Sequence, residues 1–162
     1  MKTLILYSSK TGATKQYAEW LTQDLPESIN YQIIDFDFNE SNNYSRIILA
    51  LPTRSGIIDS MNLIESNWNN IKDKEVYLIV VGMVPQEAAW SVQSYNKIRS
   101  DIRTSLKGYV KLKGISSNAD KKVSRIERFM SKLFIGIDPD TIEKRSKVLK
   151  TDLEPALKML QI

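Results

Sequence analysis

Apolar residues along this chain follow two patterns, and the two patterns alternate. Short apolar runs predict strands, whereas apolar residues three or four positions apart predict helices. Strands are expected at 3–7, 31–36, 46–51, 76–82 and 109–115. The run at 46–51 is apolar after Arg46, as in a strand covered on both faces, and Pro52 is expected to end its ladder. The run at 109–115 alternates, so it is expected at a sheet edge.

The segments between these runs carry stripes with helical spacing. The first helix is expected over 13–25, with Pro26 just beyond its end. Later stripes consist of Met61, Ile64, Trp68 and Ile71; Val92, Tyr95, Ile98, Ile102 and Leu106; Val123, Ile126, Met130 and Leu133; and Ile142, Leu149, Leu153, Ala156 and Leu160.

Regular alternation of strands and helices predicts an α/β fold with parallel strands and right-handed crossovers. We expect one domain over 1–162, with a five-stranded parallel sheet in the order 2-1-3-4-5 and helices on both faces. Ligands of such sheets bind beyond the carboxyl ends of the strands. The loops 8–14, 52–59 and 82–91 are therefore expected to lie side by side.

The composition narrows the chemistry that this chain can perform. It contains no cysteine and no histidine. This excludes disulfides, thiolate nucleophiles, Cys/His zinc sites and a Ser-His-Asp triad. Redox chemistry would need a borrowed cofactor.

Positive charge gathers in the last third of the chain. Residues 107–162 hold 13 Lys/Arg against 7 Asp/Glu, whereas residues 1–106 hold 10 against 12. This bias fits an acidic partner or a membrane surface, and it equally fits a solvated face. The segment 121–133 is a basic amphipathic pattern that could lie in a membrane interface or pack on the sheet. No nucleic-acid motif accompanies it, so a nucleic-acid partner is not expected.

No apolar run reaches the roughly 20 residues that cross a bilayer. The apolar block at the N-terminus is too short for a signal peptide and is expected to be the first strand. We expect a cytoplasmic protein. If the segment 121–133 binds a membrane instead of packing on the sheet, the contact would be peripheral and at the inner face.

The turn 8–14 joins the first strand to the first helix. Unpartnered N–H groups and the helix dipole make a helix N-terminus a natural site for phosphate. Ser9, Thr11 and Thr14 could donate hydroxyl hydrogen bonds, and Gly12 allows close approach of the backbone. The other interpretation is an ordinary Ser/Thr helix cap.

The hexapeptide Ser9-Lys10-Thr11-Gly12-Ala13-Thr14 resembles the flavodoxin phosphate motif [TS]-x-T-G-x-T, in the same strand–turn–helix context. The resemblance implies a flavodoxin-like fold, FMN as cofactor and the FMN phosphate in this turn. The segments "ALPTRSGIID" and "RIERFMSKLFIGIDPDTIE" resemble the flavodoxin-domain group that includes menaquinone-dependent protoporphyrinogen oxidase. That resemblance implies a membrane-associated insertion at 116–140.

The resemblance also implies where the rest of FMN would lie. Thr53 would bind the ribityl or phosphate end, and the Ser55-Gly56 peptide would lie beside flavin N5. Arg54 would stabilise the reduced ring, or it is a solvated loop cation. The loop 52–59 lacks the aromatic residue that many flavodoxins stack on the ring. In the third loop Met83 and Trp90 are candidates, with core packing as the other interpretation of Trp90.

The sequence thus predicts an FMN-binding electron-transfer flavoprotein whose redox partner is a protein or a quinone. It leaves open whether the chain is a carrier or an oxidoreductase similar to the protoporphyrinogen enzyme. A second hypothesis, supported by the missing aromatic residue, is an interaction or membrane-associated module that keeps the fold and has lost the cofactor.

Overall fold

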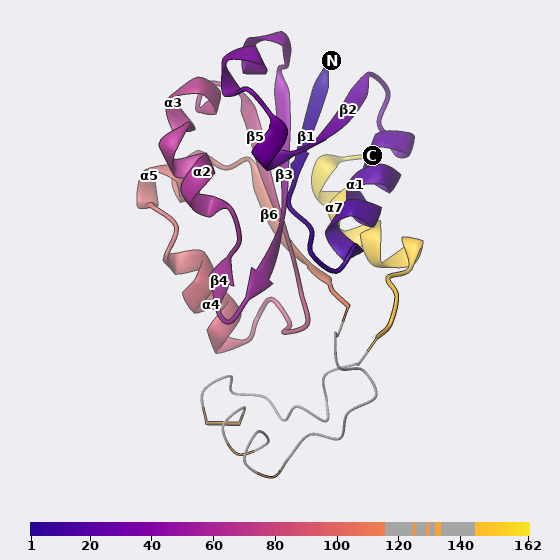
Figure 1. The fold of residues 1–162 in the computed structure, drawn as a ribbon, viewed down its shortest axis with the longest axis vertical. Helices are drawn as coiled ribbons and strands as arrows, with labels where there is room; N and C mark the ends of the chain where they lie inside the picture. Colours follow the sequence, from indigo (N-terminus) through magenta and orange to yellow (C-terminus); the bar gives the residue numbers. More distant parts are fainter. Residues whose placement is uncertain (116–124, 126–128, 130–131, 134–144) are drawn as a thin grey trace.

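A parallel sheet between two helical layers forms the body of the protein (Figure 1). The computed structural model describes residues 1–115, 125, 129, 132, 133 and 145–162. The parallel strands follow the order β2-β1-β3-β5-β6, which is the predicted order of the five expected strands. Their bounds are β1 Thr3–Tyr7, β2 Ser28–Gln32, β3 Arg46–Arg54, β5 Glu75–Gly82 and β6 Gly108–Lys113. A sixth, unpredicted strand, β4 (Ile57–Ile58), pairs antiparallel with β3.

The central strands are apolar because helices cover both of their faces. Successive side chains of a strand point to opposite faces. Leu4 and Leu6 accordingly join one buried cluster, and Ile5 joins the other. All three side chains are fully buried. This explains why β1 reads as a continuous apolar run.

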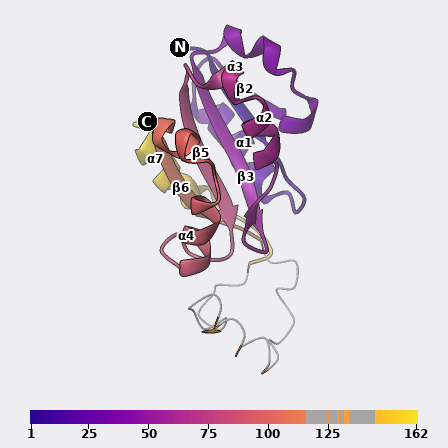
Figure 2. The ribbon, with the colours of Figure 1, turned by 90° about the vertical axis from the view of Figure 1, so that its left-hand side faces the viewer.

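Each face of the sheet has its own set of helices (Figure 2). One face packs against α1 and the C-terminal α7, and the other against the helices between β3 and β6. The helices are α1 Ala13–Asp24, α2 Met61–Ser66, α3 Trp68–Ile71, α4 Ala89–Asn96, α5 Ser100–Ser105 and α7 Glu154–Leu160. Short 3-10 helices are η1 Ile33–Asp35, η2 Phe38–Asn43 and η4 Lys150–Leu153.

The predicted bounds of the second strand were wrong. β2 covers 28–32 and pairs with β1 from Ser28 to Gln32, and η1 follows where a strand was expected. Ile33 and Phe36 are both buried, whereas Ile34 is 66% exposed. A 3-10 turn has about three residues, so it directs the first two of these side chains to the same side. Burial of that pair overrides the strand-like composition.

Pro52 does not end the third strand, contrary to the prediction. It pairs in register with Val81 of β5, and β3 continues to Arg54. The Pro52 carbonyl accepts a hydrogen bond from the Asp59 N–H at 2.9 Å, on the side away from β5. The N and C=O of a strand residue point to the same side, so the missing N–H of Pro52 removes no bond to β5.

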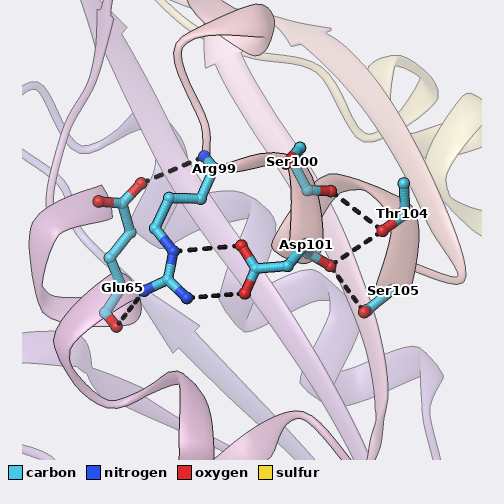
Figure 3. A network of polar contacts seen from close by, with 6 residues as sticks. All are labelled: Glu65, Arg99, Ser100, Asp101, Thr104 and Ser105. Carbon is cyan, nitrogen blue, oxygen red and sulfur yellow. Dashed lines mark hydrogen bonds and ion pairs between the residues drawn. The ribbon is translucent and has the colours of Figure 1, made fainter.

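The stripe at 92–106 forms two helices instead of one. Arg99 lies at the break with an extended backbone, and its N–H donates to Glu65 Oε1 at 3.4 Å. The Arg99 guanidinium binds the Glu65 carbonyl at 3.3 Å and both carboxylate oxygens of Asp101 (Figure 3). The break leaves Val92 46% exposed, while Ile98 is buried. Contacts with α2 therefore decide the helix boundary.

Two other helical predictions are confirmed in their buried faces. Met61, Ile64, Trp68 and Ile71 are all buried, although the helix is interrupted at Asn67. In the C-terminal stripe Leu153, Ala156 and Leu160 are buried, whereas Leu149 is exposed. Ile142, the insertion at 116–140 and most of the stripe at 121–133 lie outside the described residues. Among the described helices, none is long and apolar enough to span a membrane.

Candidate functional site

The three predicted loops meet at the carboxyl ends of the strands. Ser8 Oγ donates a hydrogen bond to Asp59 Oδ2 at 3.1 Å and so ties the first loop to the second. Between the loops lies a cavity of about 180 Å³, called the loop cavity below. Its lining consists of Lys10, Thr11, Ala13, Thr14, Pro52, Thr53, Arg54, Asp59, Val81, Gly82, Met83, Gly114 and Ile115.

The start of α1 has the features of an anion site. Gly12 is the N-cap residue with φ of 89°, and no described side chain caps the helix. The helix-cap interpretation of the hydroxyls is therefore wrong. Ser9 Oγ is buried and has no hydrogen-bond partner among the described residues. Thr14 is buried too, whereas Lys10 and Thr11 are exposed. Free N–H groups and an orphaned hydroxyl suit a phosphate.

The second loop is a β-hairpin, where the sequence had indicated only a loop. Thr53 pairs with Ile58, and Arg54 pairs with Ile57. Two residues join the strands: Ser55 with φ of 47° and Gly56 with φ of 73°. Positive φ at both positions is what a type I′ hairpin turn requires, and Gly is favoured there. The hairpin turns the Ile57 side chain outward, 62% exposed.

Trp90 packs against this hairpin turn. A Cβ atom on Gly56 would lie 2.4 Å from Trp90 Nε1, so the indole occupies the space beside the glycine. Trp90 lies in the first turn of α4 and is only partly buried, so it is not a core residue. The core-packing interpretation of Trp90 is therefore wrong.

A second cavity of about 180 Å³, called the hairpin cavity below, lies between the hairpin and α4. Thr53 and Met83 line both this cavity and the loop cavity, so the two adjoin. The full lining consists of Thr53, Ser55, Gly56, Met83, Val84, Trp90, Ser91, Ser94 and Lys111. Most of the predicted phosphate and ring residues thus line two adjacent cavities, whereas Ser9 and Gly12 line neither.

Lys111 is a site residue that sequence reasoning missed. Its Nζ donates to Ser91 Oγ at 2.6 Å, and its side chain lies beside Gly82. Burial lowers its pKa from the ordinary 10.5 to about 8, because the charged form loses solvation. The sequence pattern placed 109–115 at a sheet edge and indicated no role for Lys111. No signal in the sequence shows that α4 covers this side chain.

Gly82 makes room for two of these side chains. A Cβ atom there would lie 2.2 Å from Thr53 Oγ1 and 3.1 Å from Lys111 Cε. Thr53 Oγ1 donates to the Val81 carbonyl at 3.4 Å. Thr53, Gly82 and Lys111 thus lie close together on three neighbouring strands, with Lys111 paired in register with Val80 rather than with Gly82.

These features define the class of protein: a doubly wound α/β domain with a helix N-terminus that no described side chain caps at the first strand–helix turn, and with adjoining cavities at the carboxyl edge. The sequence profile of the family described as "Flavodoxin domain" matches residues 4–135. The chain belongs to the flavodoxin-domain family. No curated protein matches it.

The fold is similar to solved structures of low sequence identity. Trp repressor binding protein from Bacillus subtilis superimposes with a TM-score of 0.52 and 18% identity, over 71% of this chain and 88% of that chain. Two-electron reduced flavodoxin from Megasphaera elsdenii gives a TM-score of 0.51 and 16% identity, over 67% of this chain and 84% of that chain. These likenesses show the flavodoxin-like fold.

Proposed function

We propose that this chain binds FMN and transfers electrons through it. One observation carries the proposal: the turn before α1 combines an uncapped helix N-terminus with the buried, partnerless hydroxyl of Ser9. A phosphate monoester would accept hydrogen bonds from both. Membership of the flavodoxin-domain family supports the same assignment.

The two cavities suit the rest of the molecule. Ser9, Lys10, Thr11, Gly12, Ala13 and Thr14 would hold the phosphate. Thr53 borders both cavities and would bind the ribityl chain between them. Ser55, Gly56, Met83 and Trp90 would contact the ring, with Arg54 at the rim. Bound FMN would supply reversible electron acceptance, for which a chain without cysteine or histidine has few groups of its own.

The decisive experiment compares FMN with riboflavin, which lacks the phosphate. Fluorescence quenching gives both dissociation constants, for the unaltered chain and for Ser9→Ala. We expect Ser9→Ala to weaken FMN binding about tenfold, the value of one hydrogen bond to a charged group, and to leave riboflavin binding unchanged. The matched control is Ser45→Ala, an exposed serine at the amino end of β3.

Equal weakening of both ligands would place the phosphate elsewhere. A colourless purified protein that takes up neither ligand would refute the proposal. That result would favour the second hypothesis, a flavodoxin-fold module without cofactor.

A quinone acceptor and an activity similar to protoporphyrinogen oxidase are the finer part of the proposal. The hairpin carries no aromatic residue over the ring, which leaves room for a second substrate. Phe129 and Leu133, from the basic segment 121–133, are 66% and 63% exposed, as a membrane-binding face would require.

Two measurements test this finer part. A quinone-linked enzyme would oxidise protoporphyrinogen with a quinone as acceptor, whereas a carrier would need a partner protein. Membrane contact predicts co-sedimentation with anionic vesicles that is lost in Phe129→Ser/Leu133→Ser. If the chain neither oxidises protoporphyrinogen nor binds vesicles, a carrier without membrane contact would be the better description.

A further inference from the structure

Lys111 brings a positive charge to the cavities at the carboxyl edge of the sheet. Its side chain runs from β6 between the sheet and the first turn of α4, where Nζ donates to Ser91 Oγ. It lines the hairpin cavity and also a third, larger cavity of about 350 Å³. This edge cavity is lined by residues 82–87 and 111–114.

Within the part of the chain that the structure describes, this cation lacks the neutralising partner that a buried charge usually has. Across residues 1–115 and 145–162, no carboxylate forms an ion pair with Lys111. Glu87 lines the edge cavity with it but makes no such contact. The neighbouring end of α4 is an N-terminus, whose dipole is also positive. Burying a charge in these surroundings is costly unless an anion shares the site.

The neighbouring residues nevertheless leave space for the Lys111 side chain and hold its backbone in place. Gly82 is the strand residue over which the Lys111 side chain passes, and any Cβ there would come within 3.1 Å of Lys111 Cε. The backbone N–H of Lys111 is held by Gln86 Oε1 at 2.8 Å, which ties β6 to the third loop. The position of the ammonium is therefore defined by contacts from β5, the third loop and α4.

The turn before α1 borders the loop cavity through Lys10 and Thr11, whereas Lys111 borders the adjoining hairpin cavity. A molecule with its phosphate at Gly12 would pass Thr53 and Met83 and meet Lys111 at its far end. In FMN the far end is the ring. Reduction of the ring by two electrons with uptake of one proton leaves it with one negative charge.

We propose that Lys111 is the cationic group that stabilises the reduced flavin ring and so raises the reduction potential of bound FMN. This inference rests on the proposed function. It assigns to Lys111 the role for which the sequence had suggested Arg54. Arg54 is exposed on the hairpin, where solvent screens its charge, whereas Lys111 is partly desolvated.

The test measures the midpoint potential of bound FMN by dithionite titration against a reference dye. The titration is done at about pH 7, because this pH is below the lowered pKa of Lys111 and the side chain is therefore mainly charged. The variants are Lys111→Met, which keeps the length, and Lys111→Gln, which can still bind Ser91 Oγ. The control is Lys107→Met, an exposed lysine just before β6, at the opposite end of that strand.

We expect both Lys111 variants to bind oxidised FMN within about threefold of the unaltered chain and reduced FMN about tenfold more weakly. For a two-electron couple, tenfold corresponds to a fall of about 30 mV. The Lys107→Met control should show no such fall.

Four results would overturn the inference. An unchanged potential in both Lys111 variants, or an equal fall in the control, would remove the specific role of Lys111 while FMN binding stands. Parallel weakening of oxidised and reduced FMN would show that Lys111 only shapes the cavity. Failure of the unaltered chain to bind FMN would refute the proposed function, and the role of Lys111 with it.

Discussion

Gly56 and Trp90 are in direct contact, and this contact joins the hairpin to α4. The glycine lies at the turn with φ of 73°, and the indole occupies the space where a side chain would start. Lys97 Nζ adds a hydrogen bond to the Gly56 carbonyl at 3.3 Å. These contacts tie the second loop to α4 at the wall of the hairpin cavity.

Gly56→Ala should destabilise the protein more than Gly12→Ala. Both changes place a side chain at positive φ, which costs about 1 to 2 kcal/mol. Only at Gly56 does the new Cβ also meet Trp90, and overpacking adds about 1 to 3 kcal/mol. At Gly12 nothing lies within 4 Å of the new atom. Urea unfolding of the two variants measures the difference, and equal losses would contradict the Gly56–Trp90 contact.

Gly82→Ala should be destabilising and partly rescued by Thr53→Ala. The new Cβ would lie 2.2 Å from Thr53 Oγ1, a distance that forces either the Thr53 side chain or one strand end to shift. We expect a loss of about 1 to 3 kcal/mol in the free energy of unfolding. In a double-mutant cycle the second change removes the clash, so the two effects should be clearly non-additive. Simple additivity would mean that the two side chains do not share this space.

Lys111→Met should stabilise the protein near neutral pH, and the gain should shrink in alkali. Burial lowers the pKa of Lys111 to about 8 in the folded chain, against 10.5 when solvated. Below about pH 8 the folded state bears the full cost of the buried ammonium. As the pH rises towards 10.5, the folded amine is neutral while the unfolded one still binds a proton, so stability increases.

We expect a gain for Lys111→Met of about 1 to 2 kcal/mol at neutral pH, discounted for the part of the side chain that water reaches. Thermal unfolding of the variant and the unaltered chain at several pH values between about 7 and 10 measures it. A gain independent of pH would show that Lys111 is not desolvated.

Asp152→Asn should destabilise the protein far more than Asp101→Asn. The Arg145–Asp152 ion pair is largely buried, with side chains 13% and 8% exposed, and Asp152 also accepts the Leu149 N–H at 2.8 Å. Breaking a buried pair costs about 3 to 5 kcal/mol, because the remaining charge keeps its desolvation cost. The Arg99–Asp101 pair is exposed, so its loss should hardly change the denaturation midpoint. Similar shifts in urea midpoint would contradict this ranking.

The sequence predicted the order of the parallel strands and the meeting of the three loops. Both follow from local patterns: apolar runs such as 46–51 need two covering layers, and parallel strands direct their carboxyl ends to one edge. The motif at 9–14 predicted the turn between β1 and α1. It is also a local pattern, because Gly12 and the hydroxyl residues lie within a few positions of one another.

Several features could not be predicted, because each depends on a partner distant in sequence. The helix break at Arg99 depends on Glu65, and continuation of β3 through Pro52 depends on Asp59. Burial of Lys111 depends on Ser91 and Gly82, which lie on other elements. In each case the local pattern favoured the simpler structure, and a tertiary contact overrode it.

The sequence by itself determined the fold class and the strand–turn–helix at residues 3–24, because periodicity and turn chemistry act over short distances. Only the tertiary structure decided what surrounds the far end of the cavities. There the absence of a side chain on Gly56 leaves space for Trp90, and its absence on Gly82 leaves space for Thr53. The Lys111 side chain is covered by α4. Excluded volume and desolvation set these relationships, and both arise only when separate elements pack together.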